Sequence, residues 1–235
     1  MSTIPRLYVP AALVLGATIA ATAAQAHYLG QVLRRNVNDP VHLFNGQDGE
    51  WRARIAEQRR DQMILAVEAQ LRRQDPEPDL WLAFALLKRD ATDLVVQKAT
   101  ELGVSALWPV LTERTNAARV NETRLTVIAT EAAEQCERLT VPVLHPPRRL
   151  ADLLADWPSD RRLFAAIERS NAAQPRATGK PAALLVGPEG GFTPAELDAV
   201  LRHPFVTAVS LGSRVLRAET ACVAGLALLQ APWCG

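Results

Sequence analysis

Predicted strands dominate the first 70 positions of the chain. The runs PVHLFNG and EWRARI alternate on either side of the turn-forming residues NGQDG, which predicts a β-hairpin. The apolar side chains expected to share one face of this hairpin are Val41, Leu43, Trp51, Ala53 and Ile55. The run QMILAVEAQL predicts a further strand, and residues 28–35 predict a short helix between strands. A small β-barrel accommodates these elements most simply.

A connector follows at residues 72–79, where the sequence reads RRQDPEPD. Its two prolines and alternating charges are typical of an exposed segment between domains. We therefore predict an N-terminal domain over residues 1–73 and a C-terminal domain over residues 78–235.

Beyond residue 80 the pattern changes to strands that alternate with helices, which predicts an α/β domain with a mostly parallel sheet covered by helices. The predicted strands are LWLAFALL, ALWPVL, VPVLH, RLFAAI, AALLV and VTAVSL. Helices are expected over residues 91–102, ended by Gly103, over residues 122–139 behind the N-cap Asn121, and over residues 150–157.

The segment LLVGPEGGFTPAEL at residues 184–197 runs from an apolar strand through a glycine-rich turn into a helix. Thr193 is the expected N-cap, Pro194 the first helical residue, and Glu196 completes a capping box. The glycine spacing fits neither a P-loop nor a dinucleotide-binding fingerprint. Two interpretations stay open: a ligand shelf lined by main chain at the end of a strand, and a plain glycine-rich turn.

The segment SLGSRVLRAETACVAGLALLQ at residues 210–230 combines a strand end, a short loop and a helix rich in small residues. Dipole and capping effects explain an acid such as Glu219 in the first helical turn. Arg217 at the same positive helix end is electrostatically unfavourable unless an anionic partner is present, so a functional role is favoured over a purely structural one.

Residues 11–26 form an apolar stretch that ends in Ala24, Gln25 and Ala26 behind the single basic residue Arg6, and this resembles a secretion signal. The stretch is mostly Ala and Thr, is interrupted by Gly16, and is too weakly apolar for a confident membrane span. A pair of strands with buried small side chains is the preferred interpretation.

The charge of the whole chain does not identify a partner, because the formal net charge is +1 and the sequence pI is about 7.8. The first 73 residues are mildly basic, with nine Arg against six acidic residues, and Arg binds phosphate in a bidentate manner. The widely spaced Cys136, Cys222 and Cys234 predict no zinc site and a reducing compartment. Since no histidine lies in either loop, surface or packing roles are predicted for His27, His42, His145 and His203.

The two loops, together with FALLKRDATDLVVQKATELG at residues 84–103, closely resemble the RsmE family of the SPOUT superfamily, whose members methylate uracil N3 in small-subunit ribosomal RNA. Further similar stretches are RLYV at residues 6–9, AHYLGQVLR at 26–34, HLFNGQDGEW at 42–51 and EAAEQCER at 131–138. The resemblance covers nearly the whole chain. It departs from the family at residues 36–40 and in the Ala-rich composition of residues 11–26.

The resemblance implies a PUA-like β-barrel followed by an α/β domain with a trefoil knot, and a homodimer that binds S-adenosylmethionine and no metal. It implies that the cofactor lies against these residues: Val186, Gly187, Pro188, Glu189, Gly190, Gly191, Leu211, Gly212, Val215, Leu216 and Thr220. It also places residues 11–26 in a mature cytoplasmic protein without a membrane segment.

By the same resemblance, the expected reaction is methyl transfer to N3 of a specific uridine in 16S ribosomal RNA, within an assembled or nearly assembled small subunit. Arg217 is the expected stabiliser of negative charge on the uracil, while Glu219 orients Arg217 or accepts the proton. Arg6, Arg34 and Arg35 are candidate RNA contacts. The alternatives are a methyltransferase of the same fold acting on another RNA base, a non-catalytic RNA-binding assembly factor, and a secreted or membrane-anchored protein.

Overall fold

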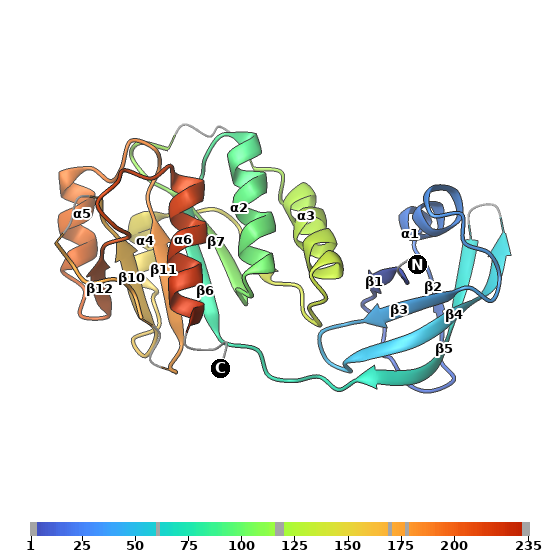
Figure 1. The fold of residues 1–235 in the computed structure, drawn as a ribbon. Coiled ribbons are helices and arrows are strands. Elements are labelled where there is room, and N and C mark those ends of the chain that lie inside the picture. Colours follow the sequence, from blue (N-terminus) through green and yellow to red (C-terminus); the bar gives the residue numbers. More distant parts are fainter. Residues whose placement is uncertain (1–3, 60–61, 116–119, 169–170, 177–178, 232–235) are drawn as a thin grey trace. The chain divides into compact units, whose positions relative to one another are not determined.

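The computed structural model describes residues 4–59, 62–115, 120–168, 171–176 and 179–231. These residues form two compact units (Figure 1). Unit 1 comprises Met1–Pro76 together with Ala133–Val141, and unit 2 comprises Glu77–Ala132 and Pro142–Gly235. The linear division expected from the connector does not include the second segment of unit 1.

Unit 1 is built on a five-stranded sheet with the order β1-β3-β4-β5-β2. Its strands are β1 (Arg6–Tyr8), β2 (Thr18–Ala20), β3 (Pro40–Phe44), β4 (Glu50–Arg59) and β5 (Gln62–Arg72). The predicted hairpin is confirmed, because Val41 pairs with Ala53 and Leu43 with Trp51 in antiparallel register. The inward side chains of these strands form one apolar core that includes Leu7, Ile19, Val41, Leu43, Ile55 and Leu65.

The prediction of two strands over residues 11–26 is wrong. This segment contains β2 and then the helix α1 (Ala23–His27), which continues into the π-helical turn η1 (Tyr28–Val32). The helix begins at Thr22, whose side chain accepts the Gln25 N–H at 3.2 Å, while the Gln25 side chain accepts the Thr22 N–H at 3.0 Å. This reciprocal capping box is a local signal for helix initiation.

A buried ion-pair cluster stabilises unit 1. The Glu50 carboxylate lies 2.5 Å from Arg6 Nε and 2.7 Å from Arg72 Nε. Burial would raise the pKa of Glu50, but the hydrogen bonds from Arg72 and Arg6 outweigh burial and hold that pKa below its usual value. Arg6 also donates to the carbonyl oxygens of Ala133, Glu134 and Arg138, at 3.1, 2.8 and 2.8 Å.

The same cluster explains why the helix predicted over residues 122–139 is shorter in the structure. The helix α3 (Glu122–Gln135) begins behind Asn121, whose side chain accepts the Arg124 N–H at 3.0 Å as expected. The chain then turns at Glu137, which has a φ of 63°. The guanidinium of Arg6 binds carbonyl groups that a continuing helix would use itself, and a cation is favourable at a helix C-terminus.

Unit 2 contains a parallel sheet with the strand order β12-β10-β11-β6-β7-β8, in which β9 also pairs with β7. Its strands are β6 (Leu80–Ala85), β7 (Ala106–Leu111), β8 (Val143–Leu144), β9 (Arg148–Arg149), β10 (Arg162–Ala166), β11 (Ala182–Val186) and β12 (Val206–Val209). The predicted α/β class is confirmed. The strands predicted at residues 106–111 and 182–186 have the predicted bounds.

Helices cover both faces of the parallel sheet (Figure 1). On one face, α4 (Leu150–Ala155) and α5 (Pro194–Leu201) contribute buried side chains to a core with Leu163, Ala183 and Leu185. On the other face, α2 (Arg89–Glu101) packs against α6 (Ala218–Gln230), and α6 packs against β11. A Cβ added to Gly225 of α6 would lie 2.6 Å from Leu184 Cδ2, so the helix approaches the strand as closely as a glycine permits.

Candidate functional site

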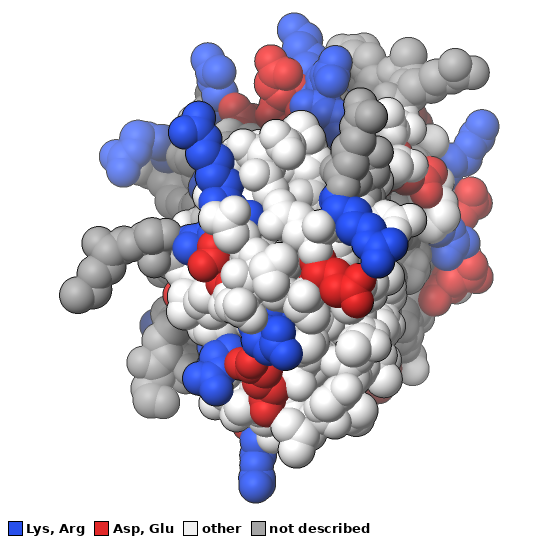
Figure 2. Space-filling view, turned by 90° about the vertical axis from the view of Figure 1, so that its right-hand side faces the viewer, with Lys and Arg blue, Asp and Glu red and all other residues white. Residues whose placement is uncertain are grey.

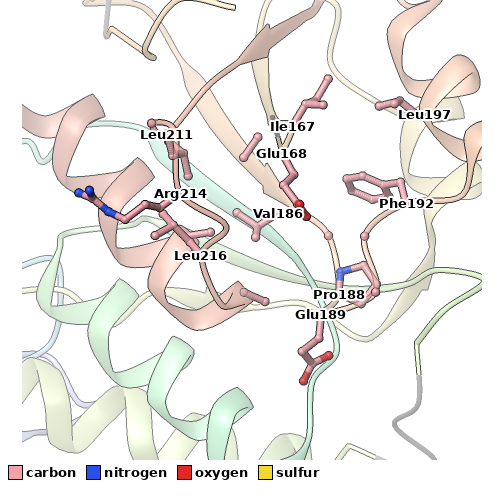
Figure 3. A pocket seen from close by; sticks show the side chains of 17 residues that line it. Ile167, Glu168, Val186, Pro188, Glu189, Phe192, Leu197, Leu211, Arg214 and Leu216 are labelled. Atoms are coloured by element: carbon pink, nitrogen blue, oxygen red, sulfur yellow. The ribbon is translucent and has the colours of Figure 1, made fainter. Parts of the chain in front are cut away.

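A cavity of about 290 Å³ lies at the carboxyl ends of β10, β11 and β12 (Figure 3). Its walls come from residues 166–168, from the loop after β11, from the loop after β12, and from the start of α6. Open parallel sheets bind small molecules at this edge, where the loops after adjacent strands meet. In Figure 3, Val186, Leu211 and Leu216 surround the space between the loops, whereas the guanidinium of Arg214 extends away from them.

The loop after β11 has a firmly specified local structure. Thr193 is the N-cap of α5 as predicted: its side chain accepts the Glu196 N–H at 3.2 Å, and Glu196 accepts the Thr193 N–H at 2.9 Å. Before the cap, the Gly191 N–H donates to the Pro188 carbonyl at 2.8 Å. Gly191 has a φ of 68°, which residues with a Cβ adopt only with strain. The glycine is therefore needed to turn the loop along the cavity.

The loop after β12 brings the start of α6 to the same cavity. Ala218 and Ala221 of this helix line the cavity, together with Leu216 just before it. Arg217 is the N-cap of α6, has an exposed side chain and makes no side-chain cap hydrogen bond. Glu219 is half-buried in the first turn. The two predicted charged residues thus flank a cavity-lining alanine without lining the cavity themselves.

The cavity includes nine of the eleven positions predicted to surround a cofactor, namely Val186, Gly187, Pro188, Glu189, Gly190, Gly191, Leu211, Gly212 and Leu216. The other two, Val215 and Thr220, are exposed and are not part of its lining. Proximity to a cavity does not test ligand binding, so these roles stay predictions.

Sequence reasoning missed eight lining residues, which are Ala166, Ile167, Glu168, Phe192, Leu197, Arg214, Ala218 and Ala221. Residues 166–168 are the last residue of the predicted strand β10 and the two residues after it. The sequence does not reveal the strand order. In the structure β10 lies between β11 and β12, which brings the end of β10 to the cavity. Arg214 and Phe192 stand within or directly beside the predicted loops and could have been included on position alone.

The three candidate RNA contacts lie in different environments within unit 1. Arg6 is buried, with its side chain 8% exposed, and its guanidinium binds Glu50 and the end of α3. This placement contradicts a role in contacting RNA, and we do not retain Arg6 for that role. Arg34 is exposed and Arg35 is half-buried. Figure 2 shows one face of the molecule, on which Lys and Arg side chains are interspersed with Asp and Glu side chains.

The other polar groups considered in the sequence lie outside the cavity lining. Burial lowers the pKa of His145, with Arg148 adding to the effect, and the centroids of the stacked His145 and Trp108 rings lie 3.5 Å apart.

Cys222 is buried. Burial, and to a smaller extent the nearby Glu219, raise the pKa of its thiol far above the ordinary value. Cys234 lies outside the described residues. Among the described residues, no group of three or more His, Cys, Asp or Glu side chains is arranged to hold a metal ion.

In the part of the chain that the structure describes, none of the helices has the length and apolar character needed to cross a membrane.

Comparison with known proteins agrees with this arrangement over most of the chain. The model of a family described as an RNA methyltransferase domain matches residues 74–230, and that of an RNA methyltransferase PUA domain matches residues 21–68. A protein from Rickettsia conorii, named ribosomal RNA small subunit methyltransferase E, is 34% identical over 207 residues, covering 86% of this chain and 84% of its own length. A protein of the same name from Synechocystis is 33% identical over 235 residues, covering 96% and 77%.

The fold agrees as well. A crystal structure of a ribosomal RNA small subunit methyltransferase E from Neisseria gonorrhoeae, bound to S-adenosyl methionine, superimposes with a TM-score of 0.90 at 30% identity and covers 98% of both chains. The two-unit architecture, the cavity at the ends of β10, β11 and β12 and these sequence matches lead to one assignment: the chain belongs to the ribosomal RNA small subunit methyltransferase E family of RNA methyltransferases.

Proposed function

We propose that this protein transfers a methyl group from S-adenosylmethionine to N3 of a specific uridine in 16S ribosomal RNA. It acts as a homodimer in the cytoplasm, on an assembled or nearly assembled small subunit. The observation that carries the proposal is the cavity made by the loops after β11 and β12, in a chain whose relative of the same fold holds S-adenosyl methionine.

The residues around the cavity suit this cofactor. Side chains such as Val186, Leu211 and Leu216 offer apolar walls for a flat adenine ring, and the glycines of residues 187–191 expose main-chain groups. When bound, S-adenosylmethionine supplies an electrophilic methyl group: its sulfur–methyl bond breaks as the bond from carbon to N3 forms, and S-adenosylhomocysteine leaves with the electron pair. The protein contributes position, which is worth roughly 7 to 11 kcal/mol in favourable cases.

Uracil N3 carries a proton and is a poor nucleophile until negative charge develops on the ring and its carbonyl oxygens. Arg217 supplies a guanidinium at the edge of the cavity for that charge, and the exposed N-terminal end of α6 adds its positive dipole. Glu219, in the first turn of the helix, orients Arg217 or accepts the N3 proton.

The proposal includes a trefoil knot in unit 2 and a partner subunit. It is supported by the meeting of two loops, residues 187–193 and 211–217, which are separated by helix α5 and strand β12. Exposed apolar side chains of unit 2, such as Leu94 and Val127, provide surface of the kind that a partner subunit covers. Arg34 and Arg35 of unit 1 are the proposed phosphate contacts.

The decisive experiment is methyl transfer with radiolabelled S-adenosylmethionine and small ribosomal subunits that lack the modification. The labelled nucleoside is identified by mass, with intact modified subunits as the control substrate. Label in N3-methyluridine is the expected result. Label in another nucleoside would indicate a different target base, and no label despite cofactor binding would indicate a non-catalytic RNA-binding role.

A further inference from the structure

A second hollow adjoins the cavity described above. It is lined by Leu86, Leu87, Lys88, Glu113 and Arg114, together with Glu189 and Gly190. Glu189 and Gly190 line the first cavity as well. The two spaces therefore meet at the glycine-rich loop after β11.

The loop after β6 forms one wall of this hollow and is held in place by its own hydrogen bonds. The Leu87 N–H donates to Thr92 Oγ1 at 3.2 Å, and Thr92 Oγ1 donates to the Leu87 carbonyl at 3.1 Å. The Thr92 N–H donates to the carbonyl of Lys88, which is the N-cap of α2. These bonds fix the backbone at Leu87 and Lys88 and leave the Lys88 side chain exposed.

The turn after β7 also lines the hollow and is hydrogen-bonded directly to the glycine-rich loop after β11. Thr112 and Thr115 close the turn, with the Thr112 N–H 2.9 Å from Thr115 Oγ1. From this turn, Arg114 Nη1 donates to the Gly190 carbonyl at 2.6 Å, and the Glu113 N–H donates to Glu196 at 2.8 Å. The glycine-rich loop after β11 therefore borders both spaces. Arg114 and Glu113, which line the second hollow, hold this loop and the start of α5 in place.

The chemistry of the hollow matches a pyrimidine base better than it matches a further part of a cofactor. Leu86 and Leu87 line the hollow but are only 2% and 4% exposed, so its charged side chains determine most of its chemistry. The charged groups around them are two cations, Lys88 and Arg114, and two carboxylates, those of Glu113 and Glu189. A uracil edge presents two carbonyl acceptors on either side of one N–H donor, so it needs both donors and an acceptor.

We propose that this hollow receives the uracil to be methylated, turned out of the RNA stack. Its carbonyl oxygens accept hydrogen bonds from Lys88 and from the Arg114 N–H groups not used by Gly190. The inference rests on the proposed function. It also satisfies a requirement of that function, because the reacting atoms of donor and acceptor must come within about 3 to 3.5 Å, and this hollow shares residues with the cofactor cavity.

The test compares Lys88→Ala with Arg89→Ala, a matched control that also removes one exposed cation but lies outside the lining. Loss of a hydrogen bond to a charged group is expected to reduce kcat/KM for small subunits by about 10- to 100-fold in Lys88→Ala. Lys88→Arg should recover part of that loss. The Kd for S-adenosylmethionine, measured by calorimetry on the free protein, should stay within about twofold of wild type, as should kcat/KM of the control.

Equal kcat/KM in Lys88→Ala and Arg89→Ala would overturn the inference. A parallel loss of S-adenosylmethionine affinity in Lys88→Ala would also overturn it, because Lys88 would then belong to the cofactor site. A wild-type protein that methylates no uridine would instead overturn the proposed function itself, and this separates the two failures.

A second readout does not depend on turnover. Small-subunit RNA carrying 4-thiouridine at the uridine identified by the methylation assay is irradiated with the protein, and the crosslinked peptide is identified by mass. Crosslinks within residues 86–88 or 113–114 are expected. Crosslinks confined to peptides outside the hollow would contradict the assignment.

Discussion

Arg217 stands where α6 begins, exposed to solvent and without a side-chain bond to the helix that follows it. Replacing it with Ala is expected to lower kcat by about 100- to 1000-fold, because removing one preorganised donor to developing negative charge costs about 3 to 4 kcal/mol. Single-turnover methyl transfer measures this loss, while thermal unfolding is expected to stay close to wild type. Arg202→Ala, which removes an exposed arginine at the end of α5, serves as the control. Undiminished turnover in Arg217→Ala would remove Arg217 from the mechanism.

Arg6 and Arg34 are expected to have different roles in unit 1: the buried Arg6 stabilises the fold, and the exposed Arg34 binds RNA phosphate. Arg6→Ala removes one of the two arginines that pair with the buried Glu50 and is expected to lower the free energy of unfolding by about 3 to 5 kcal/mol. Arg34→Ala should leave stability unchanged and flatten the salt dependence of RNA binding by about one unit of slope. Urea unfolding and binding titrations at several salt concentrations measure both. A stable Arg6→Ala protein with a flattened slope would restore Arg6 as an RNA contact.

For single residues, a role could be predicted when the interacting partners lie close together in the sequence. Thr193, Pro194 and Glu196 define a helix start within four positions, so the sequence alone was enough. Arg6 lies 44 positions from Glu50 and 128 from Glu134. Nothing in the run RLYV indicates that a carboxylate and a helix end will surround this guanidinium, so the sequence led to Arg6 being predicted as an RNA contact.

At the scale of elements, the contact between α6 and β11 depends on Gly225. Ala at this position is the better helix former by about 1 kcal/mol, but its Cβ would lie 2.6 Å from Leu184 Cδ2. We expect Gly225→Ala to be destabilising by about 1 to 3 kcal/mol and to weaken S-adenosylmethionine binding, because α6 carries Ala218 and Ala221 into the cavity. Calorimetric unfolding and cofactor titration measure these effects.

The matched control on the same helix is Ala227→Val, at an exposed position. The double variant Gly225→Ala with Leu184→Ala should be less destabilised than the sum of its parts, because the second change removes the atoms that the new Cβ meets. Strict additivity would show that the close approach at Gly225 is not the cause.

The bounds of elements with a clear local hydrophobic pattern were predicted closely. The bounds of elements that end at contacts with distant residues were not. The strands at residues 106–111 and 182–186 are continuous apolar runs in a sheet covered on both faces, and their bounds agree. The end of α3 is set by Arg6 and by the turn at Glu137, which a helical period cannot reveal. The helix α1 was missed for another reason: Thr22 and Gln25 carry a capping-box signal that the Ala-rich composition obscured.

Across the whole molecule, each unit contains an arginine-paired carboxylate whose pKa is held below its usual value. For Glu50 in unit 1, hydrogen bonds from Arg72 and Arg6 outweigh the raising effect of burial on the pKa. For Asp79 in unit 2, burial is likewise outweighed by hydrogen bonds from Arg161 and Ser105, and the pKa falls. A lowered folded-state pKa contributes stability above the unfolded-state pKa and loses it as the pH falls through the folded-state value.

The free energy of unfolding is therefore expected to decline as the pH drops below about 5. Glu50→Gln and Asp79→Asn should each be less stable than wild type at neutral pH and show a flatter acid decline. Urea unfolding between neutral and acidic pH measures both changes. Glu57→Gln, at an exposed carboxylate, should retain the wild-type slope, and an equally steep decline in Glu50→Gln would contradict the assigned cause.

The class of each unit was predictable from the sequence, whereas the arrangement of its parts was not. Alternating strands and helices identify an α/β sheet, but the order β12-β10-β11-β6-β7-β8 depends on where the chain crosses back. That order brings residues 166–168 to the cavity-lining loops after β11 and β12, and the turn at residues 112–115 to Gly190. The missed lining by residues 166–168 and the second hollow both follow from this strand order.

Unit 1 is built from two separate segments of the chain, so it can be completed only late in protein synthesis. Its first 76 residues leave the ribosome well before Ala133–Val141, the segment that completes the same unit. Until that segment emerges, Arg6 lacks the three carbonyl groups it binds, and Phe44 lacks the contacts of Ala133 and Leu139. The N-terminal unit thus reaches its final stability only after more than half of the chain has been translated, although N-terminal domains ordinarily fold first.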